Sequence, residues 1–560
     1  MPAGTEPSAG EPASSPSPVP APPAFPPAAS SPAPAPVGAL LRASSSVSAC
    51  TLVSRILGML REMAEASIFG AGWILDAFTL AFLLPNLFRR LFGEGALTGA
   101  YVPTLTRVRE QRSSEAGEKL AGAVFGVVVI FLAGVAAATI GATYLAPSSL
   151  NLKPDSAPGW TPLFLQLLRR TMPYLPLVCG SAILGGTLHV LKRFIPLAVA
   201  PIATNLAMLS ALGWMIATKM PPEEGVKLLG WALLAGGVME LGIQVISLRA
   251  ARFRVAPNLQ TKTEGVGEVA RLMGPSVFAV ALLQINLLMD NLFAQFMIPH
   301  AGAASALWCA NRVMQFPLVL LGVSVAVTSL AYFSDSWARG DRAGLARQIT
   351  EALRGTFFVS LPASIGLMVL ALPIVRGLFE RGEFTPENSA RTAGALLFYG
   401  SAVWCFNCTG VLNRVFLSMQ DPSTPMRIAA RGVVFNFVFN LLLVRKLEEN
   451  GLALATAISG VLVLAQTVWA LQKRLGPEVF AGLRGTLWKP IAGSVAMGAA
   501  CWATLAPAAD AVARTGWSQG RQNVVLMLAE TLLGVAVYGA AVIVMRDPMA
   551  PSLKKWLGRP

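Results

Sequence analysis

Residues 83–103 read LLPNLFRRLFGEGALTGAYVP, within a longer stretch from Ser54 to Pro103 that decides how the chain folds. The stretch is apolar enough to enter a bilayer, yet it carries charged side chains at Arg55, Arg61, Asp76, Arg89, Arg90 and Glu94. A charge at bilayer depth costs roughly 2.5–3.5 kcal/mol on insertion scales and persists where it faces a wet cavity or a partner. Because the arginines outnumber the carboxylates, the stretch predicts a cavity built for an anion.

The composition is that of a membrane protein. Of the 560 residues, 54% are hydrophobic and only 13% are charged, whereas a soluble domain carries about 25% charged residues. Long apolar runs recur at Leu120–Tyr144, Leu197–Ala217, Ala455–Leu471 and Val524–Met545. Each approaches or exceeds the roughly 17–25 residues that a helix needs to cross a bilayer. We therefore predict an all-α polytopic membrane protein.

Run lengths and breaks predict about fourteen transmembrane helices. They fall near 46–68, 74–104, 119–146, 162–190, 195–218, 226–249, 269–297, 302–334, 346–378, 388–418, 424–445, 450–473, 486–507 and 522–545. Strongly basic connections, such as 107–112 and 249–262, alternate with short or charge-balanced ones. The positive-inside rule then places the basic connections and both termini in the cytoplasm, and it accounts for most of the net charge of +15.

A weak internal repeat at a lag of about 225–230 residues predicts two pseudo-symmetric six-helix lobes around a central cavity. Leu84-Pro85 corresponds to Phe316-Pro317, and Gly186 to Gly410. The expected organisation is a disordered Pro/Ala/Ser-rich cytoplasmic tail (1–45), an N-lobe (46–250), a C-lobe (251–475) and a last segment (476–560). That last segment holds two extra helices and a basic cytoplasmic C-terminus.

Several classes of function are disfavoured by the residues. There is no Walker A sequence, zinc-ligand array or nucleophile elbow, so we predict no enzyme. The basic residues form no soluble patch, which speaks against nucleic-acid binding. Cys405 and Cys408 have CxxC spacing, but no second pair follows, so buried packing thiols are expected rather than a metal or redox site.

The intramembrane charges carry the functional hypothesis. Arg55 and Arg61 flank Gly58 on the first predicted helix, and Arg312 lies on the helix of the second lobe that corresponds to 74–104. A guanidinium binds phosphate in bidentate fashion and stays protonated at any working pH. The alternative is that Arg89 and Arg90 are interfacial anchors and that Arg61 pairs with Glu62 or Glu65.

Several motifs of the sequence resemble those of a known protein family. SRILGMLRE, IFGAG, LDAF, LLPNLFRRLFGEGA, AYVP and ANRVMQFP are similar to signatures of the lipid II flippase family MurJ (MviN), as are FERGEFT and MQDPSTP farther on. This family belongs to the multidrug/oligosaccharidyl-lipid/polysaccharide exporter superfamily. The resemblance runs from about residue 46 to 475 and is densest in the first two predicted helices.

The resemblance implies a transporter in the bacterial cytoplasmic (inner) membrane. Its partners would be lipid II, the surrounding membrane lipids and other cell-wall synthesis proteins. The family's cavity arginines correspond to Arg55, Arg61, Arg89 and Arg312, and Asp76 and Glu94 match its acidic positions. Two positions depart from the family pattern, because Asn311 and Gln315 stand where Asp and Glu are frequent. The cavity is therefore expected to be more positive, which puts a proton-linked role of those positions in doubt.

No cofactor is expected, but Na⁺ coupling is a second hypothesis. Asp290 lies inside a predicted helix, Asn436 and Asn440 share a helix face four residues apart, and Thr456 follows. Such oxygen ligands suit a hard cation, and the resemblance implies Na⁺ there. Interhelical hydrogen bonding by Asn and Thr is the alternative.

Other functions stay open at this point. One is a polysaccharide-lipid flippase or a drug exporter of the same superfamily, although a cation exporter would favour acidic cavity residues. A second is a non-transporting scaffold that recruits cell-wall enzymes through the N-terminal tail. A membrane transferase would require an acidic metal-binding motif, which the sequence lacks.

Overall fold

The computed structural model describes residues 37–92, 97–147, 150–152, 159–483 and 485–545. Two compact units are distinguished, Met1–Ser46 and Val47–Pro560. In the first, only the start of α1 is described, and the site belongs to the second. α1 begins at Val37, earlier than the predicted boundary, because no proline follows Pro36 and the next residues include helix formers such as Ala and Leu. The rest of the predicted tail lies outside the described residues.

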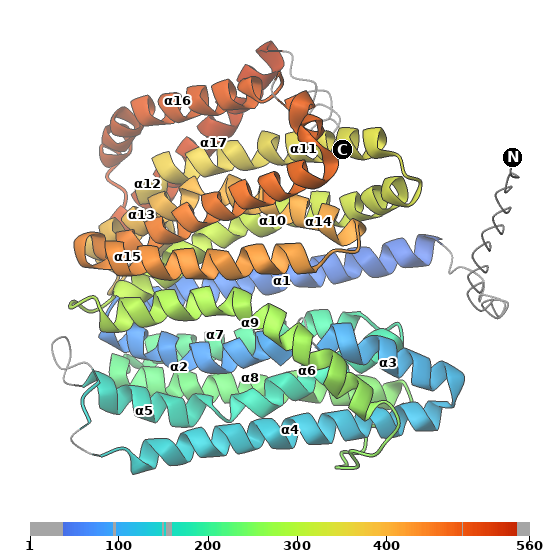
Figure 1. The fold of residues 1–560 in the computed structure, drawn as a ribbon. Helices are drawn as coiled ribbons and strands as arrows, with labels where there is room; N and C mark the ends of the chain where they lie inside the picture. The colour runs from blue at the N-terminus through green and yellow to red at the C-terminus, as the bar shows by residue number, and fades with distance from the viewer. Residues whose placement is uncertain (1–36, 93–96, 148–149, 153–158, 484, 546–560) are drawn as a thin grey trace, which may run out of the picture. The chain divides into compact units, whose positions relative to one another are not determined.

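All regular elements of the described residues are helical (Figure 1). The N-lobe comprises α1 (Val37–Phe69), α2 (Trp73–Arg89), α3 (Leu97–Gln111), α4 (Ser114–Leu145), α5 (Trp160–Thr171), α6 (Tyr174–Val190), α7 (Ile195–Thr218) and α8 (Pro222–Ala250). The C-lobe comprises α9 (Val266–Phe296), α10 (Ala303–Ala338), α11 (Arg342–Val369), α12 (Ala371–Phe379), α13 (Pro386–Ser401), α14 (Val403–Ser418) and α15 (Ser423–Leu475). A 3₁₀ helix, η2 (Pro477–Leu483), precedes α16 (Trp488–Ala513) and α17 (Gln519–Val544), which pack on α11 and α12.

The prediction of about fourteen membrane passes is confirmed over the described residues. The pairs α2/α3, α5/α6, α11/α12 and α13/α14 each make one pass, whereas α15 makes two. Glu448 interrupts α15 with φ 52° and ψ −130°. The chain folds back there, since Arg474 near the end of α15 pairs with Asp421 just before its start at 2.6 Å. By length and composition alone, nine of the described helical segments qualify as membrane spans.

Alternation of the passes gives the bundle two ends. We call the outer end the one that carries the turns 70–72, 297–302, 380–385 and 446–450. The inner end carries the basic connections, including 107–112 and 249–262. The names follow the predicted orientation. Cys405 and Cys408 are buried free thiols on α14.

Candidate functional site

A cavity with an empty volume of about 750 Å³ lies between α2 of the N-lobe and α9, α10 and α13 of the C-lobe. Its charged lining residues are Arg90, Arg312 and Asp290. Amide side chains supply most of the remaining polar wall, namely Asn86, Gln284, Asn291, Asn311 and Gln315. Asn311 and Gln315, the two departures from the family pattern, hydrogen-bond to each other. Such a wall offers two guanidinium groups for an anion and many neutral donors for hydroxyl and amide groups.

Glu62 joins the two lobes through ion pairs. Its Oε1 accepts a hydrogen bond from Arg61 Nη2 at 3.2 Å, and its Oε2 lies 2.7 Å from Arg312 Nε in an ion pair without hydrogen-bond alignment. Arg61 also faces Glu65, with Nε 3.2 Å from Oε1 but without hydrogen-bond alignment, and it donates to Asn205 Oδ1 at 3.2 Å. Arg61 is therefore buried in a local network, where it pairs with both of the glutamates that the sequence offered as alternative partners. Arg312 keeps about a third of its side chain exposed, 36%, and faces the cavity.

Arg55 and Arg312 lie close enough to repel each other. Arg55 is exposed on α1, whereas Gly58 leaves room for the Arg312 guanidinium. A Cβ added at Gly58 would lie 3.4 Å from Arg312 Nη2. Asn205 closes the other side by donating to Ser54 O at 3.1 Å. An anion placed between the two like charges would relieve their repulsion.

Arg90, rather than Arg89, lies in the cavity wall. Arg90 Nη1 donates to Gln284 Oε1 at 3.2 Å, across the lobes. Arg89 Nε donates to Asn86 Oδ1 at 3.1 Å, and Arg89 interacts electrostatically with Glu240 of α8 inside the N-lobe. Glu94, the second predicted acidic residue, lies outside the described residues.

Asp76 caps a helix of the opposite lobe. Its fully buried carboxylate accepts Gly302 N at 2.7 Å, Ser305 N at 2.9 Å and Ser305 Oγ at 2.7 Å, all at the start of α10. Gln295 donates to the Asp76 carbonyl at 2.8 Å. Nearby, Glu383 N donates to Ser67 O at 2.9 Å. These contacts join the lobes at the outer end, and we call them the outer closure.

The inner end is closed by contacts of a different kind. The first turns of α9 pack against α3, where Val269 is buried with Tyr101 and Leu105 in one core cluster. The ion pairs Arg107–Glu268 and Arg112–Glu264 flank this packing and are solvent-exposed. We call this set of contacts the inner closure.

The four residues of the predicted Na⁺ site lie together. Asp290 accepts Asn440 Nδ2 at 2.7 Å and Thr456 Oγ1 at 3.0 Å, and Asn440 Nδ2 also reaches Asn436 Oδ1 at 3.1 Å. Asn440 Oδ1 is buried and accepts no hydrogen bond within the described part of the chain. No Lys or Arg of the described residues forms an ion pair with Asp290. A buried carboxylate beside an orphaned carbonyl oxygen fits a hard cation.

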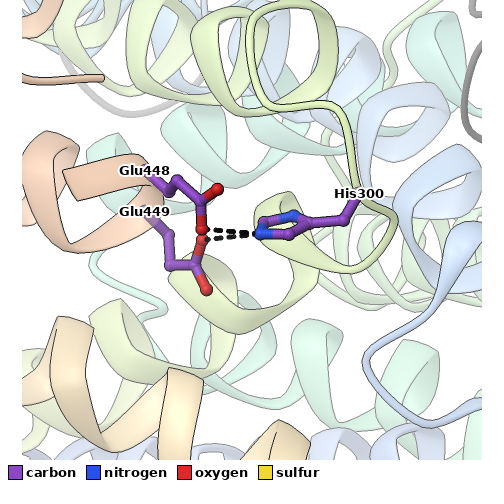
Figure 2. Close-up of side chains that lie close together, drawn as sticks. All are labelled: His300, Glu448 and Glu449. Carbon is purple, nitrogen blue, oxygen red and sulfur yellow. Dashed lines mark hydrogen bonds and ion pairs between the residues drawn. The ribbon is translucent and has the colours of Figure 1, made fainter. Parts of the chain in front are cut away.

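A second polar cluster lies at the outer end, where the carboxylates of Glu448 and Glu449 meet the ring of His300 from one side (Figure 2). Their ligand atoms lie within 4.8 Å of one another, the one such group of three among the residues that the structure describes. Arg391 Nη2, which can only donate, lies 3.2 Å from His300 Nδ1. The ring proton is therefore on Nε2, where it is donated to Glu448 at 2.7 Å. A metal on Nε2 would need the proton on Nδ1, facing Arg391, so the arrangement disfavours a metal.

Comparison with known proteins places the chain in one family. The family model described as lipid II flippase MurJ matches residues 65–513. A probable lipid II flippase MurJ of Vibrio cholerae serotype O1 is 33% identical over 90% of this chain and 96% of the relative. A lipid II flippase MurJ of Burkholderia cenocepacia is 29% identical over 78% of this chain and 84% of the relative.

Solved structures support the same fold. A lipid II flippase MurJ in an inward closed conformation has a TM-score of 0.71 at 22% identity, covering 89% of this chain and 98% of that one. An inward-facing multidrug resistance MATE transporter of the MOP superfamily has a TM-score of 0.62 at 14% identity, covering 77% and 96%. At these identities the likeness concerns the fold alone.

Proposed function

Because the chain belongs to the lipid II flippase family MurJ, we propose that it moves lipid II from the cytoplasmic to the periplasmic leaflet of the bacterial inner membrane. It is a multi-pass membrane protein of a transporter family rather than of a catalytic enzyme family. The transported lipid carries a disaccharide-pentapeptide on an undecaprenyl pyrophosphate.

One observation carries the proposal, namely the Arg312 guanidinium in an amide-lined cavity between the lobes. Arg312, Arg55 and Arg90 would neutralise the pyrophosphate, while Arg61 holds Glu62 and thereby orients Arg312. Arg89 is held by Asn86 and Glu240 inside the N-lobe, and Asp76 acts on the conformational change rather than on the phosphate. The amides offer partners to the sugars and peptide, and the acyl tail stays in lipid.

The cavity supports an alternating-access cycle. Only about 70 Å³ of this cavity can be entered by a water-sized sphere, against roughly 300–1,000 Å³ for the pocket of a drug-sized ligand, so the lobes must part to admit a disaccharide-pentapeptide. The inner closure opens to load the substrate and the outer closure opens to release it. A loaded and an empty cavity differ in charge, and each charge crossing the field responds by about 2.3 kcal/mol per 100 mV. The membrane potential can therefore reset the carrier.

Two other functions fit less well. A cation exporter would require a predominantly acidic cavity, whereas the wall holds two arginines and one aspartate. A scaffold without transport has no use for arginines that line a cavity between two lobes. The resemblance to drug exporters in solved structures concerns the fold and not the cavity chemistry.

Depletion of the protein from its native cells tests the function. We expect lipid II to accumulate in the cytoplasmic leaflet, while its synthesis continues and growth stops. The measurement is the fraction of lipid II accessible to a membrane-impermeant enzyme or probe added outside. Unchanged accessibility after depletion would mean that the chain transports something else.

We further propose that Asp290, Asn436, Asn440 and Thr456 hold Na⁺ and couple it to transport. If this holds, Na⁺ raises the thermal stability of the purified protein relative to K⁺, by about 2.7 kcal/mol at a concentration 100 times Kd. Asp290→Asn removes this effect, whereas Asp335→Asn, at an exposed aspartate of α10, leaves it in place. Transport in sealed vesicles that is indifferent to replacement of Na⁺ would show that the site is not coupled.

A further inference from the structure

Arg391 ties three segments together at the outer end. From α13, its Nε pairs with Glu449 Oε1 at 2.6 Å and its Nη2 donates to His300 Nδ1 at 3.2 Å. Its Nη1 donates to the carbonyl of Ala301 at 3.0 Å. Glu449 is almost fully buried, with 3% of its side chain exposed, so Arg391 is anchored on a rigid carboxylate.

The peptide unit between Ala301 and Gly302 is held from both sides. Arg391 donates to its carbonyl, and its N–H donates to Asp76 Oδ2 at 2.7 Å. The carbonyl and N–H of a trans peptide point in opposite directions within one plane. A guanidinium on the carbonyl therefore fixes the direction of the N–H and polarises it toward the aspartate.

Gly302 cannot be replaced by a residue with a side chain without displacing this peptide unit. Its φ is +90°, and an added Cβ would lie 2.0 Å from Ala71 O of the N-lobe. The turn is thus pressed against the opposite lobe, and small rotations of the 301–302 plane change the distance to Asp76 directly.

We propose that Arg391 is a positioning residue for the outer closure, acting through the 301–302 peptide unit on Asp76. The inference rests on the alternating access of the proposed function. Removing the guanidinium leaves Asp76 in place but takes away the group that orients its donor. The closed state of the outer end is then less favoured.

The experiment measures how far the outer end is closed, and it does so without measuring transport. Ser67→Cys and Glu383→Cys are introduced in the full chain, because Glu383 N reaches Ser67 O at 2.9 Å in the closed state. The yield of this disulfide in purified protein in vesicles measures the closed fraction. At pH 8, Arg391→Ala is expected to raise the open-to-closed ratio about tenfold, as for the loss of one charge-assisted hydrogen bond. Arg391→Lys should recover part of the closed fraction. Arg514→Ala, which removes an exposed charge at the same end, should leave the open-to-closed ratio unchanged.

A second variant, at the carboxylate that anchors Arg391, keeps the test conclusive. If Arg391→Ala does not fold, Glu449→Gln is expected to show the same loss of closure through the loss of the anchor. Equal yields in wild type, Arg391→Ala and Glu449→Gln would overturn the proposal. Because no lipid II is present, that result is distinct from a failure of the proposed transport function.

Discussion

Arg312→Ala is expected to abolish growth of cells that depend on this protein as their only lipid II flippase, while the protein remains inserted in the membrane. Arg312 is the basic residue that lines the cavity and also joins the lobes through Glu62. Charge-assisted hydrogen bonds contribute about 1.5–3 kcal/mol each. The loss of two to a pyrophosphate would lower binding by about 100-fold or more. Complementation and the amount of inserted protein are the measurements.

The double variant Arg312→Ala/Glu62→Gln distinguishes two explanations. If Arg312 only compensates the buried charge of Glu62, neutralising that carboxylate should restore growth. If Arg312 binds the substrate, the double variant should fail as the single one does. Arg339→Ala, which removes an exposed arginine at the end of the same helix, should grow normally. Normal growth on Arg312→Ala alone would contradict the role in capture.

The helical passes could be predicted from the sequence because apolar runs of bilayer length have few other uses. The fold-back at Glu448 was also predictable, since a short charged segment separates two apolar runs there. The start of α1 was placed too late, because residues 37–45 carry helix formers but few of the features of a membrane span.

The charged positions of the site could be recognised, but their partners could not. Arg61 has two candidate partners on its own helix, and both are used. Arg312 reaches Glu62 across 250 residues of sequence, and Asn205 and Gln284 carry no signal beyond being polar within apolar runs. The sequence therefore predicted which side chains are unusual, and only the packing shows that Arg61 is occupied while Arg312 faces the cavity.

Asp76 shows most clearly which contacts cannot be predicted from the sequence. A carboxylate on an apolar helix predicts a functional site, yet two of the hydrogen bonds that Asp76 accepts come from backbone N–H groups at the start of α10. A backbone N–H group is present in every residue type except proline, so the sequence pattern does not show which of these groups bind Asp76. The glycine at 302, with its positive φ, is the one trace that they leave in the sequence.

Asp76→Asn is accordingly expected to shift the protein toward the outer-open state. An amide cannot accept from both sides as the carboxylate does, because its NH₂ would face the N–H of Gly302 or the donors of Ser305. The variant also loses the negative charge at the start of α10, which the helix dipole favours. We expect a cost of about 2 kcal/mol to the outer closure, or about a thirtyfold change in the open-to-closed ratio. The disulfide between cysteines at 67 and 383 measures it.

Ser305→Ala provides the matched comparison. It removes the hydroxyl that donates to Asp76 Oδ1 at 2.7 Å but keeps the backbone donors and the charge. Its effect should be smaller, about 1 kcal/mol. The exposed ion pairs of the inner closure contribute less still, since surface pairs give about 0–1 kcal/mol. A cross-linking yield in Asp76→Asn equal to that of wild type would show that the capped helix does not hold the lobes together.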